Sequence, residues 1–366
     1  MNRSKPVFIL FASAVLALSL AAASVVSAKT LRYASQDDPQ TLDPHSSNLL
    51  PTNRVVSQVY EGLVMRDRNF KVVPALALSW SQPDPKTWRF KLRPNVKFHG
   101  GEAFSADDVV FSMERVLNAN SQLKSSVEGV ASAKKVDALT VDLLMREPNP
   151  VLPNHLVNFR IMSKEWAVKN KSETPQNYND REDTFASRTT NGTGPYMVTS
   201  RQPDIKTVLV ANANWWNKNS AEKGNITQVD LLPVKSNATR AAALLSGEVD
   251  FVLDPPPQDI ARLKENANIK IIEGLDARVQ YIGFDLSRNE LLYSDVKGKN
   301  PLKDVRVRRA ISYGIDINAI RDKVMRKLSV PIGTMVTAEI RGYTKDADKR
   351  LPFDREKAKQ LLTEAG

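Results

Sequence analysis

The first 28 residues constrain the chain most, because they determine the compartment in which the rest must fold. Arg3 and Lys5 give a positive start, and an apolar run follows from residue 7 to about residue 23. Val26-Ser27-Ala28 then supplies side chains that a signal peptidase accepts, so the pattern predicts a secretory signal cleaved after Ala28. The alternative is an uncleaved membrane anchor, but the run is short for a membrane span and a good cleavage site follows it.

The absence of cysteine restricts how an exported chain can be stabilised. The 366 residues contain none, so the fold must be held by its apolar cores without disulfides. A bacterial lipoprotein needs a cysteine directly after its signal, so we expect free diffusion in a periplasm and no lipid anchor. Nothing after Ala28 resembles a membrane span, and the remaining length suffices for two lobes of a soluble protein.

The net charge of +11 is spread along the chain and forms no long basic block. The densest cluster, Arg306, Arg308 and Arg309, belongs to an expected helix for which Asp304 is a plausible cap. The other face of this helix carries apolar or small residues at Val307, Ala310, Ile311, Gly314 and Ile315. We therefore expect these arginines on the solvated face of a core-packed helix, and we expect no nucleic-acid partner.

Short strands alternate with amphipathic helices along the chain, which predicts α/β lobes. Residues 87–92 alternate cleanly between apolar and basic side chains, as a half-buried strand does. Ser105 can cap a following helix, with Asp108 in its first turn. Two later segments, 269–272 and 278–286, also have the composition of strands.

No motif indicates catalysis or metal binding. The chain has no Cys nucleophile, no G-x-S-x-G and no phosphate loop, and Gly192 and Gly194 lack the rest of a dinucleotide fingerprint. Its three histidines are His45, His99 and His155. They have no i,i+4 pairing, so a metal site would need tertiary convergence. Trp215 and Trp216 could line a sugar or peptide site, although a packing role is favoured. We expect no enzyme activity, no cofactor and no metal.

Nine stretches occur in an order and spacing that is typical of one family. They are TLDPHSSN, QVYEGLVMRD, PALALSW, TWRFKLRPNVKFHGGEAFSADDVVFSMERV, GTGPYMV, SGEVDF, YIGFDL, NPLKDVRVRRAISYGIDINAI and FDREKAKQLLTEAG. Together they resemble the family 5 extracellular solute-binding proteins of ABC transporters, a group that includes oligopeptide-, dipeptide- and nickel-binding proteins. The resemblance covers essentially all of residues 30–366, and the helix signatures at 104–116 and 304–316 are highly specific in combination.

The resemblance implies an α/β, two-lobed periplasmic binding protein fold (type II, cluster C-like) with an extra inserted domain. The first lobe would comprise residues 29–60 plus 186–285, the extra domain 61–185, and the second lobe 286–366. Family members continue well beyond the last helix of this chain. The chain is therefore expected to lack its C-terminal part and to have an incomplete second lobe.

The resemblance also implies a function and a set of site residues. The chain would be the periplasmic substrate-binding component of an ABC importer, capturing a solute in an interlobe cleft and delivering it to an inner-membrane permease. Main chain at Asn48, Leu49 and Leu50 would pair with an extended ligand as an added strand. Tyr281 and Asp285 would lie on a strand beside the cleft.

The identity of the solute stays open. An oligo- or dipeptide is the leading candidate, while nickel complexes, opines, haem and oligosaccharides are also bound within the family. The complete protein is expected to be a monomer. The competing hypothesis is a secreted hydrolase or scaffold whose site the sequence does not reveal.

The signal hypothesis predicts that the mature protein begins at Lys29, because the cleavage pattern ends at Ala28. N-terminal sequencing of the exported protein should return Lys29. A product that begins at Met1 would contradict both the cleavage and the predicted compartment.

Overall fold

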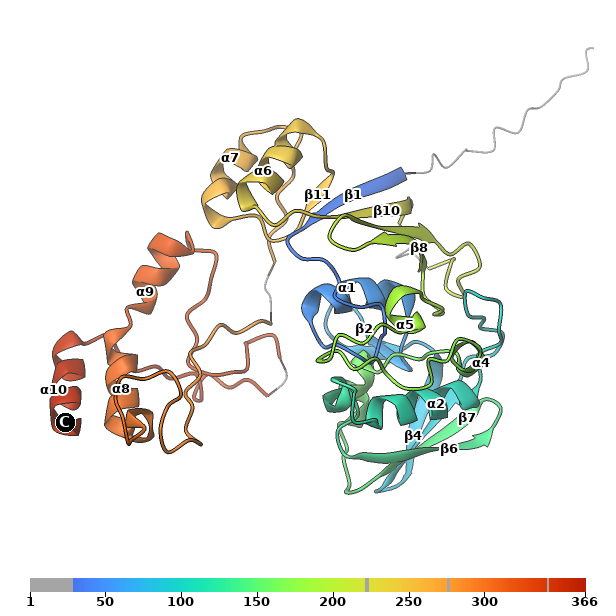
Figure 1. Cartoon of the computed structure of the whole chain (residues 1–366), viewed down its shortest axis with the longest axis horizontal. Helices are drawn as coiled ribbons and strands as arrows, with labels where there is room; N and C mark the ends of the chain where they lie inside the picture. Colours follow the sequence, from blue (N-terminus) through green and yellow to red (C-terminus); the bar gives the residue numbers. More distant parts are fainter. Residues whose placement is uncertain (1–28, 221–223, 275–276, 341) are drawn as a thin grey trace, which may run out of the picture. The chain divides into compact units, whose positions relative to one another are not determined.

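The computed structural model describes residues 29–220, 224–274, 277–340 and 342–366 (Figure 1). They form two compact units, one of residues 29–33 and 37–233 and the other of residues 34–36 and 234–366. The mixture of helices and strands confirms the predicted α/β class. The predicted signal lies outside the described residues, and the proposed division into lobes and an inserted domain stays a prediction.

The first unit holds helices α1 to α5 and strands β1 to β10, except that the end of β1 is counted with the second unit. The strands are β1 Lys29–Ser35, β2 Val64–Arg66, β3 Val72–Pro74, β4 Ala77–Asp84, β5 Thr87–Leu92, β6 Val130–Asp137, β7 Thr140–Met145, β8 Tyr196–Gln202, β9 Lys206–Ala211 and β10 Ile226–Pro233. The helices are α1 Leu50–Val59, α2 Ala106–Leu117, α3 Leu152–His155, α4 Lys164–Lys169 and α5 Phe185–Arg188, with 3₁₀ turns at Lys124–Val127 and Leu156–Asn158.

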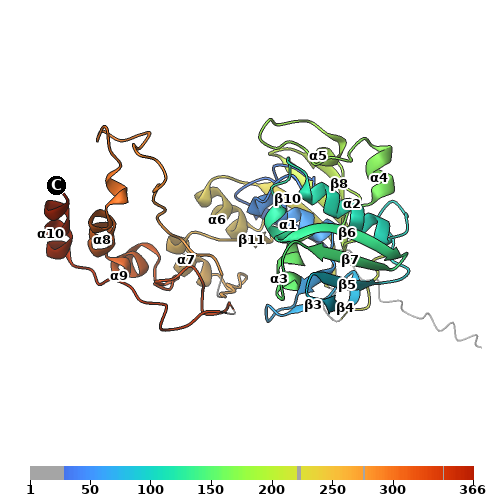
Figure 2. The same cartoon turned by 90° about the horizontal axis from the view of Figure 1, so that it is seen from below.

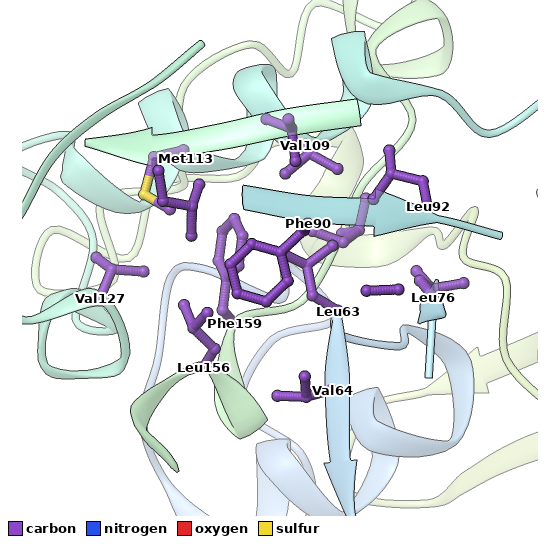
Figure 3. Packing of buried hydrophobic residues seen from close by; sticks show 14 of the residues in the cluster. Leu63, Val64, Leu76, Phe90, Leu92, Val109, Met113, Val127, Leu156 and Phe159 are labelled. Carbon is purple, nitrogen blue, oxygen red and sulfur yellow. The ribbon is translucent and has the colours of Figure 1, made fainter. Parts of the chain in front are cut away.

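A four-stranded antiparallel sheet, in the order β4-β5-β7-β6, carries the larger core of this unit. The alternation predicted for residues 87–92 is confirmed, since Phe90 is fully buried and Trp88 and Leu92 are nearly so. Helix α2 packs against β6 and β7, which can be followed in Figures 1 and 2. Figure 3 shows how Phe90 meets residues of α2, of β2 and of the segment near residue 159.

Helix α2 begins where the sequence predicted. The Ser105 hydroxyl accepts a hydrogen bond from the Asp107 amide at 3.3 Å, and the Asp108 carboxylate accepts one from the Ser105 amide at 2.9 Å. This reciprocal pair satisfies amides that the first helical turn leaves free. Val109 and Met113 lie on the apolar stripe of the helix and are buried, which fixes the helix on the sheet.

A second sheet has the order β11-β1-β10-β9-β8, where β11 is Phe251–Val252 and β8, β9 and β10 form an antiparallel meander. The two glycines that precede β8 pack against the end of α1. A Cβ on Gly192 would lie 1.9 Å from the Val59 carbonyl oxygen, and one on Gly194 would lie 2.6 Å from that of Gln58. These glycines therefore allow close backbone approach, which agrees with the absence of a dinucleotide fingerprint.

The regular elements of the second unit are mainly helices, and long stretches between them have no regular secondary structure. Its elements are α6 Asn237–Ser246, β11 Phe251–Val252, α7 Ile260–Lys264, α8 Val305–Gly314, α9 Ile317–Ala319 and α10 Arg355–Ala365, with 3₁₀ turns at Pro257–Asp259 and Pro301–Lys303 and a π-helical turn at Ile320–Val324. Helices α8 and α10 pack side by side around Ala310 and Leu361 (Figure 2). Asp304 caps α8, and Arg306 and Arg309 are exposed as predicted. Arg308 is instead half-buried and donates to the Leu302 and Lys303 carbonyls, and Ala310 alone of the residues expected on the apolar face is buried.

The strands predicted at 269–272 and 278–286 are not present, so that expectation was wrong. Both segments are described, apart from the gap that separates them, and neither pairs with a strand among the described residues. An extended segment becomes a strand only through hydrogen bonds to a neighbour, and sequence composition does not supply the neighbour.

The buried ring of Phe90 should carry much of the stability of the four-stranded sheet. We expect Phe90→Ala to lower the free energy of unfolding of this sheet by about 3–5 kcal/mol, because it removes a core ring and leaves a cavity. Leu78→Ala on the neighbouring β4 is the matched control, since Leu78 is 45% exposed and should cost little. Native-state hydrogen exchange of β5 and β7 amides measures both; equal effects would contradict the assigned core.

Candidate functional site

The segment that leads into α1, residues 37–49, has no regular secondary structure although most of it is buried. Buried backbone must find hydrogen-bond partners, and here they are partly local. The Asp43 amide donates to the Thr41 hydroxyl at 3.1 Å, and the His45 amide donates to Asp43 Oδ1 at 3.0 Å. The Leu42 amide reaches the Ser187 carbonyl at 3.0 Å. We call residues 37–49 the entry loop.

The entry loop is anchored by a buried ion pair with α2. Arg115 donates from Nη1 to Asp43 Oδ1 at 3.0 Å and from Nη2 to Oδ2 at 2.8 Å, and both side chains are fully buried. Its other donors reach the Ser172 and Thr174 carbonyls, at 3.1 and 2.9 Å, and His45 Nδ1 at 2.9 Å. All five guanidinium hydrogens therefore have acceptors, which a buried arginine requires.

The charge state of Asp43 follows from this geometry. Burial by itself would raise the pKa of the carboxyl, but the Arg115 charge and its two hydrogen bonds outweigh burial and hold the pKa below the ordinary value. The Gln176 amide adds a third donor to Asp43 Oδ2 at 3.0 Å. Asp43 is therefore an ionised anchor.

His45 is held neutral with a defined tautomer. Arg115 can only donate, so His45 Nδ1 must be the acceptor, and Nε2 carries the hydrogen that reaches the Arg160 carbonyl at 2.8 Å. Burial and the neighbouring Arg115 charge lower the pKa of His45 to about 4. The histidine thus fills a structural position in the anchor.

The entry loop delivers three of the predicted site residues to the surface. Asn48 is exposed, and Leu49 and Leu50 are 43% and 46% exposed although both are large and apolar. Leu49 is the N-cap residue of α1, with φ −81° and ψ 141°, and its carbonyl accepts from the Asn53 amide at 2.9 Å. Its own amide donates to the Ser47 hydroxyl at 3.3 Å, so the backbone polar groups of Leu49 are already engaged.

The flanking residues keep unused main-chain groups. Among the described residues, the Asn48 carbonyl and the Leu50 amide have no hydrogen-bond partner, whereas the Asn48 amide donates to Gln122 Oε1 at 3.3 Å. Residues two apart in extended backbone direct their polar groups to the same side. Asn48 and Leu50 therefore offer one acceptor and one donor beside the engaged Leu49.

The other two predicted residues belong to the second unit. Tyr281 is 68% exposed in a segment without regular structure. The Asp285 carboxylate pairs with Arg288 and accepts from the Ser287 amide at 3.1 Å, and these bonds, mainly those from Arg288, lower its pKa. The Asp285 carbonyl accepts from Asn300 Nδ2 at 2.8 Å. A ligand-binding role for these two residues stays a prediction.

The two tryptophans donate hydrogen bonds to a half-buried carboxylate. Trp215 Nε1 donates to Glu61 Oε1 at 3.1 Å, and Trp216 Nε1 donates to Oε2 at 2.8 Å, where the Thr193 hydroxyl also donates at 2.8 Å. Burial raises the pKa of Glu61 despite these donors. The Arg93 guanidinium lies 4.0 Å from the centre of the Trp216 ring. The arrangement accords with the packing role favoured for this pair.

The residues of the anchor were missed by sequence reasoning. Arg115 lies 72 positions from Asp43, and neither its spacing nor its neighbours mark it as a partner for the entry loop. The sequence offered one indirect indication. A charged residue on a helix that packs into a core needs a buried partner, but the sequence does not say which residue that partner is. Among the described residues no group of three or more His, Cys, Asp or Glu side chains is placed to hold a metal, and no helix is long and apolar enough to cross a bilayer.

Solved structures with the same architecture define the class of the fold. The oligopeptide-binding protein AppA from Bacillus subtilis, in complex with a nonapeptide, matches with a TM-score of 0.79 at 22% identity, covering 93% of this chain and 64% of AppA. NikZ from Campylobacter jejuni, in complex with Ni(L-His), matches with a TM-score of 0.78 at 24% identity, covering 92% and 63%. The fold is that of the periplasmic binding proteins.

The family follows from the sequence comparison. Residues 71–366 match the model described as bacterial extracellular solute-binding proteins, family 5 Middle, and the chain belongs to this family. It is 31% identical to the dipeptide-binding protein of Escherichia coli K12, over 96% of this chain and 66% of that protein. It is 30% identical to heme-binding protein A of Haemophilus influenzae, over 86% and 57%. The chain thus spans less than two thirds of the length of these relatives, which are named as binding proteins.

The neutral, buried His45 should make stability depend on pH in a defined window. Its folded pKa of about 4 lies below the ordinary value of 6.5, so the unfolded chain binds a proton that the folded chain does not. Stability is therefore fully present above pH 6.5 and falls by about 3 kcal/mol in total as the pH drops to 4. Urea unfolding of the wild type and His45→Gln at pH 7, 5.5 and 4 should show a larger loss in the wild type. The variant should keep a smaller loss, because burial also lowers the pKa of His99, which both proteins contain.

His155→Gln is the matched control for that experiment, because His155 lies outside the anchor. It should keep the pH dependence of the wild type. An unchanged dependence in His45→Gln would show that His45 is not held neutral.

Proposed function

We propose that the chain acts in the periplasm as the substrate-binding part of an ABC importer, capturing a small solute and delivering it to an inner-membrane permease. Membership of the family and the periplasmic binding protein fold support this role. The observation that carries it in this chain is the anchored entry loop, which ends in exposed Asn48, Leu49 and Leu50 with one free acceptor and one free donor.

We further propose that the solute is a short peptide. An extended peptide presents alternating main-chain donors and acceptors, which the Asn48 carbonyl and the Leu50 amide complement by strand addition. The relatives include proteins named as dipeptide-binding and glutathione-binding, and a similar fold from Helicobacter pylori holds the peptide STSA. Haem and a nickel–histidine complex are the competing ligands, because one relative is named for haem and one similar structure contains Ni(L-His).

The main-chain hypothesis predicts the effect of one substitution. Leu50→Pro removes the free amide, and proline is well accepted at the first position of a helix, which Leu50 occupies in α1. Peptide affinity should fall by about 1–3 kcal/mol if the peptide carbonyl is left buried and unpaired. Calorimetry with di- and tetrapeptides measures the change in affinity. Leu50→Ala keeps the amide and removes most of the side chain, so it separates the effect of the lost amide from that of the lost side chain.

Equal affinities in Leu50→Pro and wild type would contradict strand addition at this segment. Mass spectrometry of the recovered peptides should show them intact. Cleavage would support the competing hydrolase hypothesis. Saturable binding of haem or Ni(L-His) without peptide binding would show that the solute is one of these compounds and not a peptide.

A further inference from the structure

A polar hollow of about 780 Å³ opens in the first unit, and its lining does not include residues 48–50. Its walls are the stretch 176–188, the start of the entry loop at Gln40, and the end of β8 with the turn that follows it. The volume falls within the range of small-molecule sites. None of its lining residues was assigned to ligand binding above.

The floor of the hollow contains a fixed arginine. Arg201 lines it and is held by Asp38, with Nη2 at 2.9 Å from Oδ2, while the same Nη2 donates to the Pro39 carbonyl. The Arg201 side chain is only 11% exposed. The other terminal nitrogen of Arg201, Nη1, has no hydrogen-bond partner among the described residues. It is not among the enclosed atoms either, so it remains available to donate to a ligand. A guanidinium fixed in this way loses little entropy when it binds an anionic oxygen.

The same pair has unused hydrogen-bonding capacity. Arg201 Nε and Asp38 Oδ1 are enclosed and lack partners among the described residues. Enclosed polar atoms in folded proteins are nearly always bonded to protein, to water or to a bound group, so these two atoms can bind a polar ligand or water.

The wall adds charges of both signs that are free or weakly held. Arg181 is exposed and has no ion-pair partner among the described residues. Glu182 uses Oε2 to accept from the Asn177 amide at 2.9 Å, which leaves Oε1 uncommitted within the described part of the chain. Arg188 pairs with Asp183 at 3.0 Å, but both side chains are more than half exposed, so the pair is readily opened.

The wall is also preorganised. The Glu182 amide donates to the Asn177 carbonyl and the Arg181 amide to the Tyr178 carbonyl, both at 3.2 Å, while Asn177 Nδ2 donates to Asp180 Oδ2 at 2.6 Å. These bonds close the turn on itself, so its charged side chains leave from a defined backbone. A preformed wall lowers the entropic cost of binding.

We propose that this hollow is a second binding site, for a small zwitterionic solute of amino-acid size. The carboxylate of the solute is received by Arg201 and Arg181, and its ammonium group by Glu182. The lining charges favour a zwitterion. Three arginines line the hollow together with Glu182 and Asp183, and Asp38 pairs with Arg201, so an anion or a cation alone leaves one sign unmatched. The site is separate from the one proposed at Asn48 to Leu50.

The test uses the full chain, L-glutamine as the probe, and citrate and putrescine as probes of a single sign. Glutamine should produce saturable amide shifts at residues 176–188 and 201 in NMR spectra, and neither single-sign probe should do so. Arg181→Gln and Glu182→Gln should each weaken glutamine binding roughly tenfold, the loss expected for one charged hydrogen bond. Gln at 182 still offers an oxygen to the Asn177 amide, so that variant spares the turn.

Two control variants distinguish the test of this site from the test of the proposed import function. Arg66→Gln removes an equal charge from an exposed arginine outside the hollow and should titrate like the wild type. Leu50→Pro should also leave these shifts unchanged, whatever it does to peptide affinity. No saturable shift with glutamine, equal saturation by citrate alone, or wild-type affinity in both wall variants would overturn the proposal.

Discussion

The buried ion pair between Asp43 and Arg115 is the interaction on which the entry loop depends. It joins the loop to α2, and its remaining donors tie in the Ser172 and Thr174 carbonyls. Either charge left alone in this interior would cost several kcal/mol, whereas the paired and fully hydrogen-bonded arrangement is tolerated. The three segments are therefore stable in this arrangement only together.

Features that depend on neighbours in sequence could be predicted. The Ser105 cap, the alternation at 87–92 and the exposure of Arg306 and Arg309 on α8 all follow from local spacing, and the structure confirms them. The strands expected at 269–272 and 278–286 also rested on local pattern, and they were wrong because a strand requires a partner that its own sequence does not provide.

The candidate site shows the same division between what the sequence predicts and what only the structure reveals. Asn48, Leu49 and Leu50 were carried over from a family resemblance, and the structure adds that the Leu49 polar groups are engaged while the Asn48 carbonyl and the Leu50 amide are free among the described residues. The anchor and the hollow escaped prediction because each unites segments far apart in the chain. Spacing within one segment carries no information about such contacts.

Gln176 connects the anchor to the hollow. Its amide donates to Asp43, its side-chain oxygen accepts from the Ser46 hydroxyl at 3.1 Å, and it lines the hollow. A solute bound there would contact a residue that helps to fix the entry loop. Any coupling between the hollow and the segment 48–50 must be reciprocal, because binding free energies are linked.

The central claim is that the Asp43–Arg115 pair fixes the segment that presents Asn48 to Leu50. A double-mutant cycle with Asp43→Asn and Arg115→Met, read by hydrogen exchange of the Leu49 amide, tests it most directly. Each single change should destabilise the loop by about 3–5 kcal/mol, and the double change should cost little more than either. Additive effects, or single variants with wild-type protection at Leu49, would contradict the account.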